Sequence, residues 1–178
     1  MAQARIAQLG RHVSFGGVPK AELLERLVAA GVQLNAAGLD LFADERFYTS
    51  AHPATLHAFQ VTPGDLGLRN GGVMTDIVAA AVDHGLSLCP LELGPHLRLA
   101  FRDQAEGAVG NAPSKHRAPP GSITVASAPL SDDDETPKGF YLRRIEGTLW
   151  LRGYRSWDGH IWAPDDVFVF ASASSTAT

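Results

Sequence analysis

Residues 138–170 read KGFYLRRIEGTLWLRGYRSWDGHIWAPDDVFVF, and this stretch decides the fold of the chain. Apolar and polar residues alternate along it, which is the pattern of strands with one buried and one exposed face. Two pairs that end in glycine, Glu146-Gly147 and Asp158-Gly159, interrupt the alternation and are typical of hairpin turns. The stretch therefore predicts an antiparallel sheet: FYLRRI pairs with TLWLRGYR, RSW pairs with HIWA, and DVFVFA is the last strand.

One face of the first predicted hairpin carries arginines between aromatic rings. Residues two apart share a face of a strand, and a two-residue turn places Arg143 opposite Trp150 and Tyr141 opposite Arg152. The resulting Arg/aromatic face consists of Tyr141, Arg143, Trp150, Arg152 and Tyr154. The opposite face is apolar and is expected to enter the core; it carries Phe140, Leu142, Leu149 and Leu151.

Three amphipathic helices are expected before this sheet, over residues 18–31, 36–44 and 73–85. Asn35 is the expected N-cap of the second helix, and Gly31 is the expected stop of the first. Four further segments are expected to be short strands or extended chain: LHAFQV, LSLCPLEL, HLRLAFR and SITVASAPL. HLRLAFR is assigned as a strand because its apolar and polar residues alternate strictly.

Helices and mixed segments first, with an antiparallel sheet last, predict an α+β fold. In this fold the N-terminal helices pack on a C-terminal, mostly antiparallel sheet. We expect a helical or mixed lobe over residues 1–103 and an antiparallel β lobe over residues 118–172, joined in one compact domain. Residues 104–121 are rich in glycine, proline and alanine, which predicts a flexible loop between the two lobes.

The composition is that of an ordinary globular protein, with 178 residues of which 45% are hydrophobic and 19% charged. The net charge of −4 argues against a strongly basic nucleic-acid protein, although a local patch can still bind an anion. No signal-peptide pattern and no apolar run of roughly 18 residues occurs, so we expect a cytoplasmic protein outside the membrane.

No motif predicts a cofactor or a metal site. The chain lacks the P-loop, the GxGxxG and GxSxG patterns and a kinase signature. Its seven histidines show no HxxxH or HExxH spacing, and the single cysteine, Cys89, cannot form a disulfide within the chain. We therefore expect no cofactor and no metal, and we favour a protein that is not an enzyme.

A second constellation lies in CPLELGPHLRLAFR, residues 89–102, where Glu92, His96 and Arg98 fall within seven residues. A carboxylate, an imidazole and a guanidinium around one cleft would suit a small enzyme or toxin-like effector. Cys89 with His96 would make a nucleophile pair, although a buried and inert thiol is the more common arrangement. The simpler interpretation of the other two residues is an ion pair between Glu92 and Arg98.

Two resemblances bear on function. The pattern KxELLxxLxxxGV, within residues 19–42, resembles SAP-like helix–extended–helix modules and implies nucleic-acid binding; its residues are Lys20, Glu22, Leu23, Leu24, Leu27, Gly31 and Val32. The ordered set VSFGGVPKAELL, DLFADERF, LSLCPLELGPHLRLAF, APPGSITVAS and KGFYLRRIEGTLWLRGYR is similar to a group of small bacterial proteins, some automatically labelled "helicase". A helicase motor needs a P-loop and a core of several hundred residues, so this chain is not one.

Three hypotheses follow for function. The first is a binding module that holds nucleic acid, a nucleotide or another anionic ligand on the Arg/aromatic face with help from Arg98, since arginine pairs with phosphate and aromatic rings stack on bases. The same side chains could instead only stabilise the sheet through cross-strand cation–π pairs. The second is the enzyme or toxin-like effector built on Glu92, His96 and Arg98. The third is an immunity-type or structural partner of another protein, which an exposed apolar patch would favour.

Overall fold

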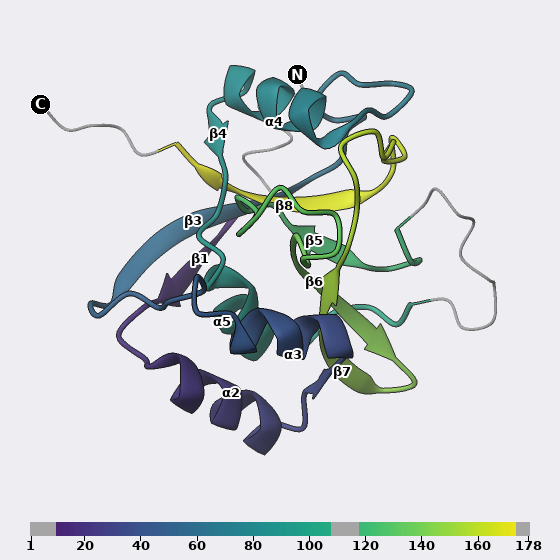
Figure 1. Cartoon of the computed structure of the whole chain (residues 1–178). Helices are drawn as coiled ribbons and strands as arrows, with labels where there is room; N and C mark the ends of the chain where they lie inside the picture. Colours follow the sequence, from purple (N-terminus) through teal and green to yellow (C-terminus); the bar gives the residue numbers. More distant parts are fainter. Residues whose placement is uncertain (1–9, 108–117, 174–178) are drawn as a thin grey trace, which may run out of the picture.

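The computed structural model describes residues 10–107 and 118–173, which form helices on a mixed, curled sheet (Figure 1). The helices are α2 (Lys20–Ala29), α3 (Ala36–Ala43), α4 (Met74–Asp83) and α5 (Leu93–Ala100). The strands are β1 (Gly10–Phe15), β2 (Gln33–Leu34), β3 (Ala54–Val61), β4 (Leu86–Ser87), β5 (Ile123–Val125), β6 (Gly139–Ile145), β7 (Thr148–Tyr154) and β8 (Val167–Ser172). The strand order is β1-β3-β8-β5-β6-β7-β2, and β4 pairs with β8. An α+β fold is consistent with these elements.

The sheet is mixed, which corrects the expectation of a mostly antiparallel one. β2 pairs with β7 in parallel, and β5 pairs with β8 in parallel. Parallel neighbours cannot be joined by a short hairpin, so their partners lie far apart in the sequence. Hairpin turns and alternation indicate which strands pair when the two strands follow each other in the chain. They do not indicate the parallel pairs β2 with β7 and β5 with β8.

Strands from both predicted lobes join this one sheet. β3, from the first lobe, pairs with β8 of the second through the register Ala58 to Ala171 and Val61 to Phe168. The centre of the predicted 104–121 loop lies outside the described residues. Its described ends are packed on the sheet, since Gly107 donates to the carbonyl of Arg144 and Gln104 is buried.

The helices expected at 36–44 and 73–85 form as α3 and α4, and the helix expected at 18–31 forms as α2. Asn35 caps α3 as expected, because its side-chain oxygen accepts the backbone N–H of Gly38 at 2.8 Å. The same side chain also exchanges two hydrogen bonds with the backbone of Gly153 in β7, at 2.8 and 3.0 Å. A Cβ at Gly153 would lie 2.5 Å from the backbone of Ala37, so glycine permits this close approach of helix and strand.

The prediction of a strand at HLRLAFR is wrong, because residues 96–100 of this segment belong to helix α5. Leu93 and Leu97 lie four residues apart and are both buried, which is the spacing of one helix face. Pro95 fits because it stands in the first turn, where its missing N–H has no partner within the helix. The alternation of Leu97, Leu99 and Phe101 suits either structure, and burial against the sheet selects the helix.

Two further expectations about strands need correction. RSW and HIWA do not form a hairpin, although residues 158–159 do make a turn. Trp162 instead pairs with Gly72, with backbone hydrogen bonds of 3.1 and 2.9 Å, so a distant segment replaces the local partner. LSLCPLEL contributes only the two-residue strand β4, and β1 was not anticipated from the sequence.

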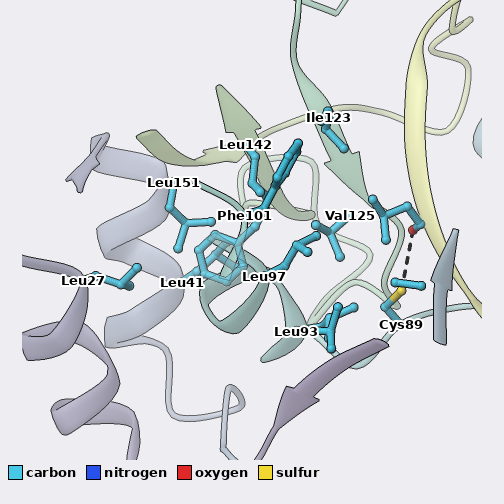
Figure 2. Packing of buried hydrophobic residues seen from close by; sticks show 14 of the residues in the cluster. Leu27, Leu41, Cys89, Leu93, Leu97, Phe101, Ile123, Val125, Leu142 and Leu151 are labelled. Atoms are coloured by element: carbon cyan, nitrogen blue, oxygen red, sulfur yellow. Dashed lines mark hydrogen bonds between the residues drawn. The ribbon is translucent and has the colours of Figure 1, made fainter. Parts of the chain in front are cut away.

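A hydrophobic core lies on each face of the sheet. Along β8, Val169 and Ala171 face the core that α2, α3 and α5 cover, while Phe168 and Phe170 face the core that contains Ile77 of α4. Figure 2 shows the first core, where Leu27, Leu41, Leu93 and Leu97 meet Leu142 and Leu151 of the hairpin. Figure 1 shows α4 beside β4 and β8, apart from the other three helices. Among the described residues, no helix is long and apolar enough to cross a bilayer.

Candidate ligand-binding site

The β6–β7 hairpin places all five residues of the Arg/aromatic face on one side of the sheet. The observed register pairs Tyr141 with Arg152 and Arg143 with Trp150, as the two-residue turn predicts. On the other side, Phe140, Leu142 and Leu151 are fully buried in the first core. The described helices that contact β6 and β7 are α3 and α5, and they pack on that apolar side. The Arg/aromatic face is therefore not covered by the N-terminal helices, and its side chains are half-buried.

Arg152 is held in place by two aromatic neighbours. Its Cζ lies 5.0 Å from the centroid of the Trp150 ring and 5.9 Å from that of Tyr141. Its Nε donates a hydrogen bond of 2.8 Å to the hydroxyl of Tyr141. A ring face attracts a cation, so this contact fixes the plane of the guanidinium. The terminal nitrogens of Arg152 make no hydrogen bond in the described part of the chain.

Arg143 and Arg152 form no ion pair within the described residues, in contrast to four other arginines. Those four pair with a carboxylate: Arg26 with Glu22, Arg46 with Asp44, Arg144 with Glu106 and Arg155 with Asp40. All 19 acidic side chains fall within residues 10–107 and 118–173, so no acidic side chain outside them is available. The Nε of Arg143 is buried and has no hydrogen-bond partner. Two arginines on this face therefore have no carboxylate within ion-pair distance among the described residues, although the chain carries a net charge of −4.

A pocket of about 210 Å³ opens at one end of the Arg/aromatic face, and Tyr141 and Tyr154 form part of its wall. Its lining also includes Ser122 and Thr124 from the β5 segment, and His160 and Trp162 from the loop between β7 and β8. Thr124 pairs with Tyr141 across β5 and β6, which explains why the two side chains lie together. Burial raises the pKa of Tyr154, so its hydroxyl remains protonated at neutral pH.

Arg98, which was expected to join this face, lies elsewhere. Its side chain is completely buried under the hairpin, on the apolar side of the sheet. It donates to Gln104 at 2.6 Å, to the carbonyl of Trp150 at 3.4 Å and to the carbonyl of Phe101. Burial, together with the positive charges of nearby Arg102 and Arg144, lowers the pKa of Arg98 to about 10, so the group is still charged at neutral pH. Its role in this position is structural.

Glu92 and His96 lie together on α5, but Arg98 does not join them. The carboxylate of Glu92 accepts the hydroxyl of Ser50 at 2.5 Å and the Ser50 backbone N–H at 3.1 Å, so the expected pair with Arg98 is wrong. The Nε2 of His96 accepts the backbone N–H of Gly16 at 3.3 Å. Residues two apart on a helix point in different directions, which separates Arg98 from His96. None of the three lines the pocket at the end of the Arg/aromatic face.

Cys89 is an inert, buried thiol. Its Sγ donates to the carbonyl of Val169 at 3.6 Å, the contact drawn as a dashed line in Figure 2. Burial raises the pKa of Cys89 to about 12, so the reactive thiolate is not formed at neutral pH. Cys89 and His96 therefore do not form an activated nucleophile. Within the described residues, no three His, Cys, Asp or Glu side chains are placed to hold a metal ion.

Sequence reasoning missed the pocket because its residues come from segments that are far apart in the chain. Ser122 and Thr124 alternate with the core residues Ile123 and Val125. This alternation was the one sequence signal that Ser122 and Thr124 face away from the first core. Trp162 was assigned to a strand rather than to a pocket wall. Its contact with Tyr154, at 5.7 Å between ring centroids, depends on the loop that follows β7.

Comparison with known proteins identifies no relative: no protein-family profile, no curated protein and no solved structure matches this chain. Function is therefore argued from the geometry and charge of the site.

Proposed function

We propose that this protein is a binding module that holds single-stranded nucleic acid or a nucleotide on its Arg/aromatic face. The observation that carries the proposal is the pair of arginines, Arg143 and Arg152, that lack a carboxylate partner on a face that no described helix covers. Four other described arginines, Arg11, Arg69, Arg98 and Arg102, also have no carboxylate partner, but only Arg143 and Arg152 stand together beside aromatic rings on this face. An anionic ligand would supply the missing counter-charge.

Phosphate is the anion that suits these groups. The planar guanidinium presents two N–H groups in a fork that matches two phosphate oxygens. Contact with Trp150 and Tyr141 orients the fork of Arg152, so less rotational freedom is lost when the ligand binds. Arg143 lies diagonally across the two strands from Arg152, because Arg143 pairs with Trp150 and Arg152 with Tyr141.

The aromatic rings favour a single strand over a duplex. Bases stack on exposed aromatic side chains only when they are not already paired and stacked within a helix. Trp150 and Tyr141 stand beside the arginines on the sheet surface, so one patch offers both phosphate contacts and ring contacts. A basic footprint of only two arginines is also small for a duplex, which is recognised through many phosphate contacts.

The test compares the wild type with Arg143→Ala/Arg152→Ala in binding a labelled single-stranded oligonucleotide, by fluorescence anisotropy at low and moderate salt. We expect the double variant to bind at least about tenfold more weakly, because each charge-assisted hydrogen bond contributes about 1.5–3 kcal/mol and about 1.4 kcal/mol corresponds to a factor of ten. The slope of log K against log salt should fall by about 1.4, which corresponds to two phosphate contacts on a single strand.

A matched control removes two arginines that already have carboxylate partners, Arg26 and Arg46. The variant Arg26→Ala/Arg46→Ala changes the net charge by the same amount and should bind within about twofold of the wild type, since long-range charge is screened by salt. Unchanged binding in Arg143→Ala/Arg152→Ala, or an equal loss in both double variants, contradicts the proposal.

The other hypotheses have weaker support. The enzyme or toxin-like effector required Glu92, His96 and Arg98 at one cleft, and Arg98 is bonded to Gln104 instead. A protein-binding partner would use exposed apolar side chains, of which Trp157 and Ile161 are 51% and 57% exposed in the loop after β7. These two belong to a single loop rather than to a continuous apolar face.

A further inference from the structure

Two residues with hydroxyl groups, Ser122 and Thr124, line the pocket beside the Arg/aromatic face. Ser122 is 5% exposed, and its Oγ is buried without a hydrogen-bond partner; Thr124 is 3% exposed, and its hydroxyl forms no hydrogen bond with another described residue. A hydroxyl that is removed from water and left unpaired weakens the folded state. Buried polar groups are almost always satisfied, so the unpaired hydroxyl of Ser122, with Thr124 two residues away on the same strand face, points to a ligand that bonds to it.

The wall of the pocket is made of rings. Tyr154 contacts Trp162 edge-on with 5.7 Å between ring centroids, and His160 contacts Trp162 at 4.7 Å. Tyr141 lies 6.5 Å from Tyr154 and extends the wall toward the arginines. Rings and hydroxyls together suit a flat molecule that stacks on one side and offers donors and acceptors along its edge.

The size of the pocket and the charges around it restrict which ligands fit. The volume of about 210 Å³ is smaller than the roughly 300–1,000 Å³ of drug-sized sites, so one ring system fits and a whole nucleotide does not. No carboxylate lines the pocket, and the charged Arg155 at its rim is already paired with Asp40 at 2.9 Å. A cationic group would therefore find no carboxylate partner in the pocket.

We propose that this pocket binds one planar heterocycle, an unpaired nucleobase, with its edge on the hydroxyls of Ser122 and Thr124 and its ring against Tyr154 and Trp162. The inference rests on the proposed function, because the phosphate that follows the base would lie on the arginines. Tyr141 joins the two sites, since it lines the pocket and its hydroxyl accepts from Arg152. The base comes either from a free nucleoside or from an unpaired position in a strand.

The test measures three ligands on one set of variants. The ligands are the four ribonucleosides, a labelled single-stranded oligonucleotide, and an abasic strand of the same length and backbone. The variant Ser122→Ala/Thr124→Val removes both hydroxyls with little change of shape. We expect it to bind the base-bearing strand about tenfold more weakly, as for the loss of hydrogen bonds to a buried edge, and to bind the abasic strand as the wild type does.

Two controls separate loss of binding from loss of folding. Because the hydroxyls have no partner, Ser122→Ala/Thr124→Val should unfold in urea at the same or a higher midpoint than the wild type. Thr124→Ser in an otherwise wild-type chain retains the hydroxyl and should retain the preference for the base-bearing strand. If the wild type binds a nucleoside and Ser122→Ala/Thr124→Val does not, the ligand is a free nucleoside. If the double variant is weakened only toward the base-bearing strand, the ligand is an unpaired base within a strand. Either result supports the pocket.

The outcomes also separate this inference from the proposed function. If the wild type binds the base-bearing and abasic strands equally well and binds no nucleoside, the proposal that the pocket holds a base is wrong. The arginines then remain a phosphate-binding site. If Arg143→Ala/Arg152→Ala binds both strands as the wild type does, the proposed function fails, and nucleoside binding that depends on the hydroxyls would then stand alone. A lower urea midpoint for Ser122→Ala/Thr124→Val contradicts the claim that its hydroxyls are unpaired.

Discussion

His96 connects α5 to the bend that precedes α2, because its Nε2 accepts the backbone N–H of Gly16. Only a neutral imidazole has a nitrogen that can accept in this way. Burial lowers the pKa of His96 below its ordinary value of 6.5; the neighbouring carboxylate of Glu92 opposes the shift, and Arg26 adds to it. The folded protein therefore resists protonation of this residue more than the unfolded chain does.

The consequence for stability has a definite sign. Below pH 6.5 the unfolded chain binds a proton at His96 that the folded chain does not, so stability falls as the pH drops from about 6.5 toward the folded pKa. The variant His96→Gln keeps an acceptor but cannot titrate, and its free energy of unfolding should change less between pH 7 and pH 5 than that of the wild type. Urea unfolding at both pH values measures the difference, and identical pH dependence in the two proteins refutes the assignment.

At the scale of elements, the β6–β7 hairpin carries backbone strain at its turn. Glu146 has φ of 49° and Gly147 has φ of 78°, so both central residues adopt the left-handed conformation of a type I′ turn. Glycine adopts this conformation freely, whereas glutamate loses roughly 1 kcal/mol in it. The side chain of Glu146 is exposed and forms no ion pair with another described residue.

Asparagine tolerates this conformation better than glutamate and is the preferred first residue of the turn. Glu146→Asn should therefore raise the free energy of unfolding by about 0.5–1 kcal/mol, while Glu146→Val should lower it, because a β-branched residue suits positive φ least. Thermal or urea unfolding of the two variants checks the order. Equal stability of both would show that the turn relaxes without strain.

At the scale of the whole molecule, Arg98 and Gln104 form a buried junction between α5 and the sheet. Arg98 reaches Gln104 and the carbonyl of Trp150, and the side-chain nitrogen of Gln104 donates to the carbonyls of Leu142 and Gly121, both at 3.0 Å. Arg98 and Gln104 together therefore bond three distant points of the chain, the carbonyls of Gly121, Leu142 and Trp150, and the guanidinium of Arg98 has no carboxylate partner. Such a charge is stable only while its neutral partners remain in place.

Gln104→Leu should cost about 1.5–3 kcal/mol, because it removes the neutral side chain that accepts a hydrogen bond from the buried charge of Arg98. Arg98→Met removes the charge together with its need for partners, and it should cost less. In the Arg98→Met background, Gln104→Leu should lose part of its effect, with a coupling energy of about 0.5–3 kcal/mol. A double-mutant cycle in urea measures this coupling, and additive effects would show that the two residues stabilise the fold independently.

Contacts between neighbours in the chain were predictable from sequence. The register of β6 with β7 followed from a two-residue turn and from alternation, and Arg143 does lie opposite Trp150. The Asn35 cap of α3 was predictable for the same reason, since its partner Gly38 is three residues away. The strand β1, the pairing of Trp162 with Gly72 and the conformation of residues 93–100 depend on distant partners, and local patterns were silent or misleading there.

The sequence by itself determined the hairpin, its apolar side and the five residues of the Arg/aromatic face, because alternation on a strand is fixed by backbone geometry alone. Only the tertiary structure decided that no described helix packs on this face, that Arg98 lies on the opposite side of the hairpin, and that Ser122, Thr124 and Trp162 line a pocket at its end. Burial and closure of a pocket depend on which distant segments pack together, and the parallel pairing of β5 with β8 brings those segments into place.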